Sequence, residues 1–284
     1  MMLTKQELKI RLKAVKAKGF ELTESETVSD YLEAMLAHIG DPDAELRDEL
    51  IYECFYFWIV KKDYLPGDEV KALCGKLLSD DYAFYQIGTT GDDSVLRRSF
   101  SILAMSPVLS YCLNKGCLND SEVVEIKEKL IDYLMREKDT RGFVEAKGWA
   151  HSIAHCADAL NYIVNFDSMR EEDYLDVLNA VRDKLLMVDT CFGANEDERL
   201  SFLVSFTIIP EKRVGTDKIS EWLATFVKVN EIEDYQRKFM AKQNCNHFIR
   251  SIYFSLVHLN AGSELLQTLI ETEKALNMYY RHFK

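Results

Sequence analysis

Residues 174–188, YLDVLNAVRDKLLMV, carry apolar side chains at the spacing of an amphipathic α-helix. The apolar positions recur at intervals of three and four residues from Tyr174 through Val181 to Val188, which places them on one helix face. The same spacing returns near the end of the chain, in Phe248–Leu259, and over most of the remaining sequence. The pattern therefore predicts a chain built almost entirely from helices.

Composition supports this prediction, because 12 glycines and 4 prolines among 284 residues are too few for the turns of an all-β protein. We expect about eleven or twelve helices of roughly 12–25 residues, joined by short loops. Consecutive helices without strands either form a bundle or stack as helical hairpins. We predict an irregular α-α superhelix of armadillo- or HEAT-like hairpins, in one domain that covers residues 1–284.

Arginines enter apolar helical segments at intervals of roughly 50 residues, at Arg47, Arg98, Arg199 and Arg250. In a solenoid, equivalent positions of successive repeats line one surface. The recurrence therefore suits a concave face lined by arginines. The alternative is coincidence among the 35 basic residues of the chain.

Three segments test the helical interpretation locally. Phe55–Val60 and Phe202–Ile209 are rich in β-branched and aromatic residues, yet their neighbours have helical periodicity, so both are predicted to be buried helix. Pro107 lies inside the apolar pattern of Leu96–Leu113, where a proline removes a backbone hydrogen bond. We expect a kink or a break there.

Charge and cysteine usage exclude several classes of protein. A net charge of −12 argues against a nucleic-acid-binding protein, which needs clustered lysine and arginine. The seven cysteines are scattered without a CxxC pair, which is typical of reduced thiols buried in a helical protein. The longest apolar run, Cys54–Val60, is far shorter than the roughly 20 residues that span a bilayer. We therefore expect a cytoplasmic protein with no transmembrane segment.

The segment richest in reactive side chains lies near the middle of the chain. If Glu145–Ile163 is helical, His151, His155 and Asp158 share one face. Such a stripe is a candidate site for a divalent metal such as zinc, although the familiar protease motif has glutamate where this chain has Ser152. The alternatives are a polar network that holds helices in register, or a ligand-binding or catalytic role without metal.

Two neighbouring residues offer further ligand-binding groups. Arg141 precedes Gly142 and could clamp a carboxylate or phosphate, or else pair with Asp139 across the turn. Trp149 is a candidate pocket wall, although a tryptophan in a helical protein is commonly core. The full set of candidate ligand-binding residues is Arg98, Arg141, Trp149, His151, His155, Asp158, Arg199 and Arg250.

Six short motifs occur in a fixed order between about residues 40 and 260. They are Leu46-Arg47-Asp48, Arg98-Ser99-Phe100, Asp139-x-Arg141-Gly142, Gly148-Trp149-x-His151-x-x-Ala154-His155-x-x-Asp158, Glu196-Asp197-Glu198-Arg199-Leu200 and Phe248-x-Arg250-x-x-Tyr253. In these motifs the chain resembles an uncharacterised bacterial family, domain of unknown function 2785. The resemblance implies a single cytoplasmic domain with no established activity. It also implies a shared polar site that links the histidine stripe with Arg98, Arg199 and Arg250.

Two functions follow from these patterns. The first is a helical-repeat protein that binds a small anionic ligand or a peptide on a concave polar face. The alternative is a metal-dependent hydrolase that uses His151, His155 and Asp158. No complete catalytic set can be written from the sequence, so the binding protein is the favoured interpretation. Whether the protein is an enzyme, which ligand it binds and its oligomeric state are left open.

Overall fold

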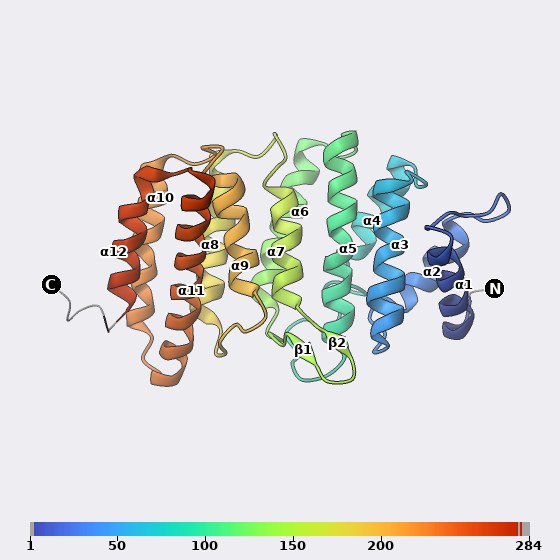
Figure 1. The fold of residues 1–284 in the computed structure, drawn as a ribbon, viewed down its shortest axis with the longest axis horizontal. Helices are drawn as coiled ribbons and strands as arrows, with labels where there is room; N and C mark the ends of the chain where they lie inside the picture. Colours follow the sequence, from blue (N-terminus) through green and yellow to red (C-terminus); the bar gives the residue numbers. More distant parts are fainter. Residues whose placement is uncertain (1–2, 278, 280–284) are drawn as a thin grey trace. The chain divides into compact units, whose positions relative to one another are not determined.

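The computed structural model describes residues 3–277 and 279, and in this part of the chain it contains twelve α-helices and one two-stranded β-hairpin (Figure 1). The all-α prediction is therefore confirmed. No helix among the described residues is long and apolar enough to cross a membrane. The chain divides into two compact units, which we call the first unit (1–119 and 137–162) and the second unit (120–136 and 163–284).

In its described residues the first unit contains six α-helices, two π-helical segments and the hairpin. In chain order they are α1 (Lys5–Ala17), α2 (Ser29–Ala37), η1 (Glu45–Tyr52), α3 (Glu53–Tyr56), η2 (Phe57–Lys61), α4 (Gly67–Leu77), α5 (Ser94–Lys115), β1 (Phe143–Val144), β2 (Gly148–Trp149) and α7 (Ser152–Ile163). The segments η1, α3 and η2 follow one another without a break. The predicted helix at Phe55–Val60 is thereby confirmed.

The second unit is entirely helical in its described residues. Its elements are α6 (Asp120–Arg136), α8 (Glu171–Met187), α9 (Glu196–Phe202), η3 (Leu203–Ile208), α10 (Thr216–Ala224), η4 (Thr225–Glu231), α11 (Tyr235–Leu259), η5 (Ser263–Leu265) and α12 (Leu266–Leu276). The apolar stripe of α8 is buried, and the run Phe202–Ile209 continues α9 as a π-helical segment rather than a strand. Both segments are helical as predicted, but the predicted burial of the second is wrong at Phe202 and Phe206, which are exposed.

Pro107 does not break its helix, because α5 runs from Ser94 to Lys115 through it. Of the predicted kink or break, the break is therefore wrong, and the kink stays a prediction. A proline inside a helix costs about 3 kcal/mol through a lost hydrogen bond and a steric clash. Nearly every side chain of α5 between Val95 and Cys112 is buried, and this packing offsets the cost of the proline.

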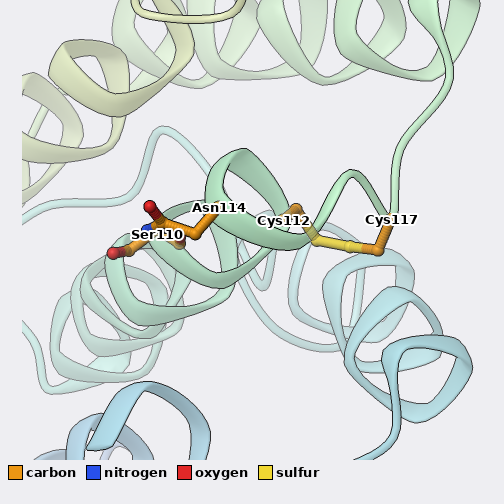
Figure 2. Close-up of a disulfide and its surroundings, with 4 residues drawn as sticks. All are labelled: Ser110, Cys112, Asn114 and Cys117. Atoms are coloured by element: carbon orange, nitrogen blue, oxygen red, sulfur yellow. Dashed lines mark hydrogen bonds between the residues drawn. A yellow bond between two sulfur atoms is a disulfide. The ribbon is translucent and has the colours of Figure 1, made fainter.

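The structure contains a disulfide between Cys112 and Cys117, with 4.8 Å between their Cα atoms (Figure 2). Helix α5 is capped by Gly116, whose φ of +69° turns the chain back so that Cys117 reaches Cys112. On the preceding turn, Asn114 Nδ2 donates a hydrogen bond to the carbonyl oxygen of Ser110 (2.8 Å). The expectation that all seven cysteines are reduced is therefore wrong for this pair.

The predicted helix over Glu145–Ile163 is correct only from Ser152 onward. The residues before it form the hairpin, in which Phe143 pairs with Trp149 and Val144 pairs with Gly148. Gly148 has φ +78°, and a Cβ atom on it would lie 2.9 Å from the Cβ atom of Ala44. The hairpin thus depends on a close approach to a residue about one hundred positions earlier, which helical periodicity cannot reveal.

Candidate functional site

His151 lies at the junction between the hairpin and α7. Its φ of +50° is in the left-handed region, which is uncommon for residues other than glycine. The backbone N–H of His151 donates to the carbonyl oxygen of Arg141 (3.1 Å), and its own carbonyl oxygen accepts from the N–H of His155 (2.9 Å). The N–H of His151 therefore closes the hairpin segment, and its carbonyl oxygen accepts a hydrogen bond from the first turn of α7.

The two imidazoles are part of a continuous series of aromatic rings. The indole of Trp149 stacks on His151 with 4.1 Å between ring centroids, and Phe143 packs edge-on against the indole at 5.2 Å. The ring of His155 is perpendicular to that of His151 at 5.7 Å and contacts Phe100 at 5.2 Å. Both histidines are buried, whereas Trp149 is 40% exposed. Phe143, at 64% exposed, and the indole are thus the solvent-facing end of this series.

A hydrogen-bond chain fixes the orientation of His155. The buried hydroxyl of Ser99 donates to the carbonyl oxygen of Ala150 and lies 2.8 Å from His155 Nδ1. A hydroxyl has one proton to donate, so with that proton on Ala150 the Ser99 oxygen must accept from Nδ1–H. This arrangement places a proton on Nδ1 of His155 and ties α5 to the start of α7.

The hydrogen bonds of Ser99 are expected to contribute to the free energy of unfolding. Replacing Ser99 with alanine should lower the free energy of unfolding by about 1–3 kcal/mol, since two buried polar groups lose their partner. Urea unfolding followed by circular dichroism measures the change. Ser220→Ala is the matched control, because that hydroxyl is exposed and bonds only to a carbonyl of its own helix. A Ser99→Ala protein as stable as this control would contradict the assigned role.

Arg98 is completely buried and forms a bidentate ion pair with Glu137, also completely buried, through Nε–Oε2 (2.7 Å) and Nη2–Oε1 (2.9 Å). Its other N–H groups donate to the segment 85–94. These acceptors are the carbonyl oxygens of Tyr85, Gln86 and Thr89 and the hydroxyls of Thr89 and Ser94. The guanidinium group thus fastens two loops of the first unit together.

Arg141 pairs with Asp139 across the turn, the second of its two predicted roles. Nε and Nη2 of Arg141 lie 2.8 and 2.7 Å from the two carboxylate oxygens, and Nη2 also donates to the carbonyl oxygen of Asp92 (2.6 Å). Burial raises the pKa of Asp139, but hydrogen bonds from Arg141 and Gly91 outweigh it and hold the pKa below its usual value. The carboxylate therefore stays charged and anchors the start of the hairpin.

Arg47 belongs to the predicted arginine recurrence but not to the predicted set of ligand-binding residues. Its buried guanidinium donates to the carbonyl oxygens of Asp41 (2.7 Å), Lys147 (2.7 Å) and Trp149 (3.3 Å) and lies 4.4 Å from the centroid of Phe100. Burial lowers the pKa of Arg47. Arg47 therefore holds the hairpin against the N-terminal part of the first unit.

Asp158 is half-buried on α7. The pKa of Tyr52 is raised to about 12, mainly by burial and secondly by the negative charge of Asp158. Among the described residues, no group of three or more His, Cys, Asp or Glu side chains is arranged to hold a metal ion. Metal ligation by His151, His155 and Asp158 stays a prediction.

Arg199 and Arg250 belong to the second unit, whereas the other six candidate residues belong to the first. Arg250 is half-exposed, and its Nε and Nη2 donate to one oxygen of Glu273 at 3.1 and 2.6 Å. Arg199 is half-buried on α9. Of these two arginines, Arg250 lines a cavity.

This cavity has a volume of about 410 Å³ and lies between α9–η3 and α11. Phe202 and Phe206 stack on each other with 4.1 Å between centroids and are 42% and 41% exposed, and Phe254 opposite is 58% exposed. The exposure of these phenylalanines was not predicted. The spacing of four residues between Phe202 and Phe206, which puts them on one helix face, is the local signal for this pair. The lining residues are Glu198, Ser201, Phe202, Phe206, Arg250, Ser251, Phe254, Ser255 and His258.

These observations define an all-α protein with an arginine-centred polar network in its first unit and an aromatic cavity in its second. The chain belongs to the family described as a protein of unknown function, DUF2785, whose profile matches residues 83–254. The match begins after Arg47 and includes Arg98, the histidine segment and Arg250. Neither curated proteins nor solved structures give a match to the chain.

Proposed function

We propose that the protein is a binding module that holds a small anionic ligand or a peptide in the cavity between α9–η3 and α11. The observation that carries this proposal is the state of Arg250. Glu273 holds the guanidinium through Nε and Nη2, while Nη1 makes no hydrogen bond to any described residue. A fixed arginine with two N–H groups available in a cavity can donate hydrogen bonds to a carboxylate or phosphate.

Two other arginines of the predicted set, Arg98 and Arg141, are less accessible than Arg250. Arg98 and the additional Arg47 are 0% exposed, and both terminal nitrogens of each guanidinium donate to protein oxygens. Arg141 is half-exposed but shares its charge with Asp139. An anion needs donors that it can reach from solvent, so Arg250 is the favoured binding group. In this proposal the polar signature of the first unit maintains the fold.

The composition of the cavity also suits a ligand with an apolar part. Three half-exposed phenylalanines supply apolar surface, and the hydroxyls of Ser251 and Ser255 supply a few orienting polar groups. Small-molecule sites commonly have volumes of roughly 300–1,000 Å³ with this mixture of apolar lining and few polar groups. A peptide side chain or a small aromatic acid meets these requirements.

A pair of probes that differ only in charge tests the proposal. We expect 4-phenylbutyrate to bind the wild-type protein about ten-fold or more tightly than 4-phenylbutyramide, because its carboxylate accepts charge-assisted hydrogen bonds from Arg250. Isothermal titration calorimetry gives both affinities. Arg250→Gln should remove the preference for the acid.

Arg213→Gln is the matched control, because Arg213 also pairs with a glutamate in the second unit and lies outside the cavity lining. This variant should keep the wild-type preference for the acid. Equal binding of acid and amide by the wild-type protein would contradict the proposal. An undiminished preference in Arg250→Gln would contradict it as well.

A further inference from the structure

We propose that the ligand of this site is an extended peptide that crosses α11 at Arg250. The peptide places one bulky apolar side chain on each side of the helix and an acidic residue between them. This inference rests on the proposed function and specifies its ligand.

A second cavity, of about 390 Å³, lies on the other side of the same helix, between α11 and α12. Figure 1 shows α11 flanked by α9 and α12 in the second unit, and α11 contacts both of these helices. The cavity is mainly apolar in its lining. The lining residues are Ile249, Arg250, Tyr253, Phe254, Leu269, Ile270, Glu273 and Lys274.

Both cavities share Arg250 and Phe254, which are one helical turn apart on α11. These two side chains therefore form a ridge with an apolar depression on either side. A ligand confined to one cavity would use one face of this ridge. A ligand that crosses the ridge contacts both depressions and passes the free Nη1 group of Arg250.

The dimensions of packed helices set the spacing of such a ligand. Neighbouring helices pack about 8–10 Å apart, so depressions on the two sides of one helix are separated by a similar distance. A peptide in the polyproline II conformation rises about 3.1 Å per residue and has three residues per turn. Residues i and i+3 then project from the same side of the peptide, about 9 Å apart. This spacing matches two anchors with two residues between them.

The charges around the ridge place the acidic residue between the anchors. Arg250 and Lys274 are the cationic groups of the two linings, and Glu273 is already paired with Arg250. Glu198 is an exposed carboxylate in the first cavity and opposes an anion there. Removing that charge with Glu198→Gln should therefore tighten the binding of an acidic peptide. The Phe202–Phe206 stack favours an aromatic anchor, and Leu269 with Ile270 favours an aliphatic one.

Fluorescence anisotropy with a labelled peptide, acetyl-GFEPLG-amide, tests the inference. This probe has phenylalanine and leucine three positions apart, with glutamate between them and a proline that favours the extended conformation. We expect glycine in place of either apolar residue, or lysine in place of the glutamate, to weaken binding about ten-fold or more. Removing the proline, which shortens the spacing by one residue, should have a comparable effect.

Variants of the protein assign each anchor to its cavity. The Phe206→Ala protein should bind the parent peptide more weakly than the wild-type protein does, and replacing the peptide's phenylalanine with glycine should not weaken its binding further. The Ile270→Ala protein should show the same pattern when the peptide's leucine is replaced. Circular dichroism establishes that each variant is folded. If the leucine and Ile270 prove dispensable while Arg250→Gln still removes the preference for acid, the crossing geometry is wrong and the proposed function stands. If Arg250→Gln leaves the preference unchanged, or the lysine peptide binds most tightly, both are wrong.

Discussion

Replacing Arg98 with methionine is expected to lower the free energy of unfolding by about 3–5 kcal/mol, because it leaves the Glu137 carboxylate buried without its partner. Both side chains of this pair are 0% exposed, so solvent cannot replace the lost interaction. Arg98 also holds the segment 85–94 through hydrogen bonds to three carbonyl oxygens and two hydroxyls. Urea unfolding followed by circular dichroism measures the loss.

Lys115→Met is the control for this experiment, because Lys115 pairs with Asp63 at 2.7 Å while both side chains are about half exposed. An exposed pair contributes roughly 0–1 kcal/mol, so the control should remain close to the wild-type stability. The double variant Arg98→Met, Glu137→Leu removes the stranded charge and should recover part of the loss. If Arg98→Met is as stable as the control, the buried pair does not hold the first unit together.

Arg47→Lys is expected to lower the free energy of unfolding by about 2–4 kcal/mol, although it preserves the charge. An ammonium group is a single point and lacks the fork that reaches Asp41 and Lys147 from opposite sides of the guanidinium. At least one buried carbonyl oxygen then loses its hydrogen bond, and the contact with the Phe100 ring is weakened. Urea unfolding again measures the change.

The Arg47→Lys variant should also loosen the hairpin specifically. Amide hydrogen exchange in residues 142–151 should accelerate relative to the wild-type protein, whereas exchange within α8 of the second unit should not change. Arg237→Lys, at an exposed position near the start of α11, is the matched control and should alter neither stability nor exchange. Unchanged protection of the hairpin in Arg47→Lys would show that other contacts hold it.

Much of the fold follows from local sequence, because burial of one helix face leaves a visible period. The stripe from Tyr174 to Val188 and the run Phe202–Ile209 were predicted correctly for this reason. The hairpin before α7 was missed, because it depends on Gly148 packing against Ala44 and on the bonds from Arg47 to its carbonyl oxygens. Contacts between residues so far apart leave no local period.

The site was predictable only in part. The pairing of Arg141 with Asp139 was one of two predicted alternatives, because the two residues are only two positions apart, across a turn. The partner of Arg98 is 39 positions away, and the cavity at Arg250 joins helices about 50 positions apart, so neither arrangement is visible from sequence. The disulfide has a local signal, since Gly116, a residue type that commonly follows the last turn of a helix, lies between Cys112 and Cys117.

Amide hydrogen exchange with and without acetyl-GFEPLG-amide tests the binding proposal most directly, because it locates the ligand without any substitution. The proposal predicts that the peptide slows exchange in residues 198–206, 249–258 and 269–274, which contain the linings of both cavities. It also predicts no change in residues 139–155, where the histidine segment maintains the fold. Slower exchange centred on 139–155, with none in the second unit, would contradict the account.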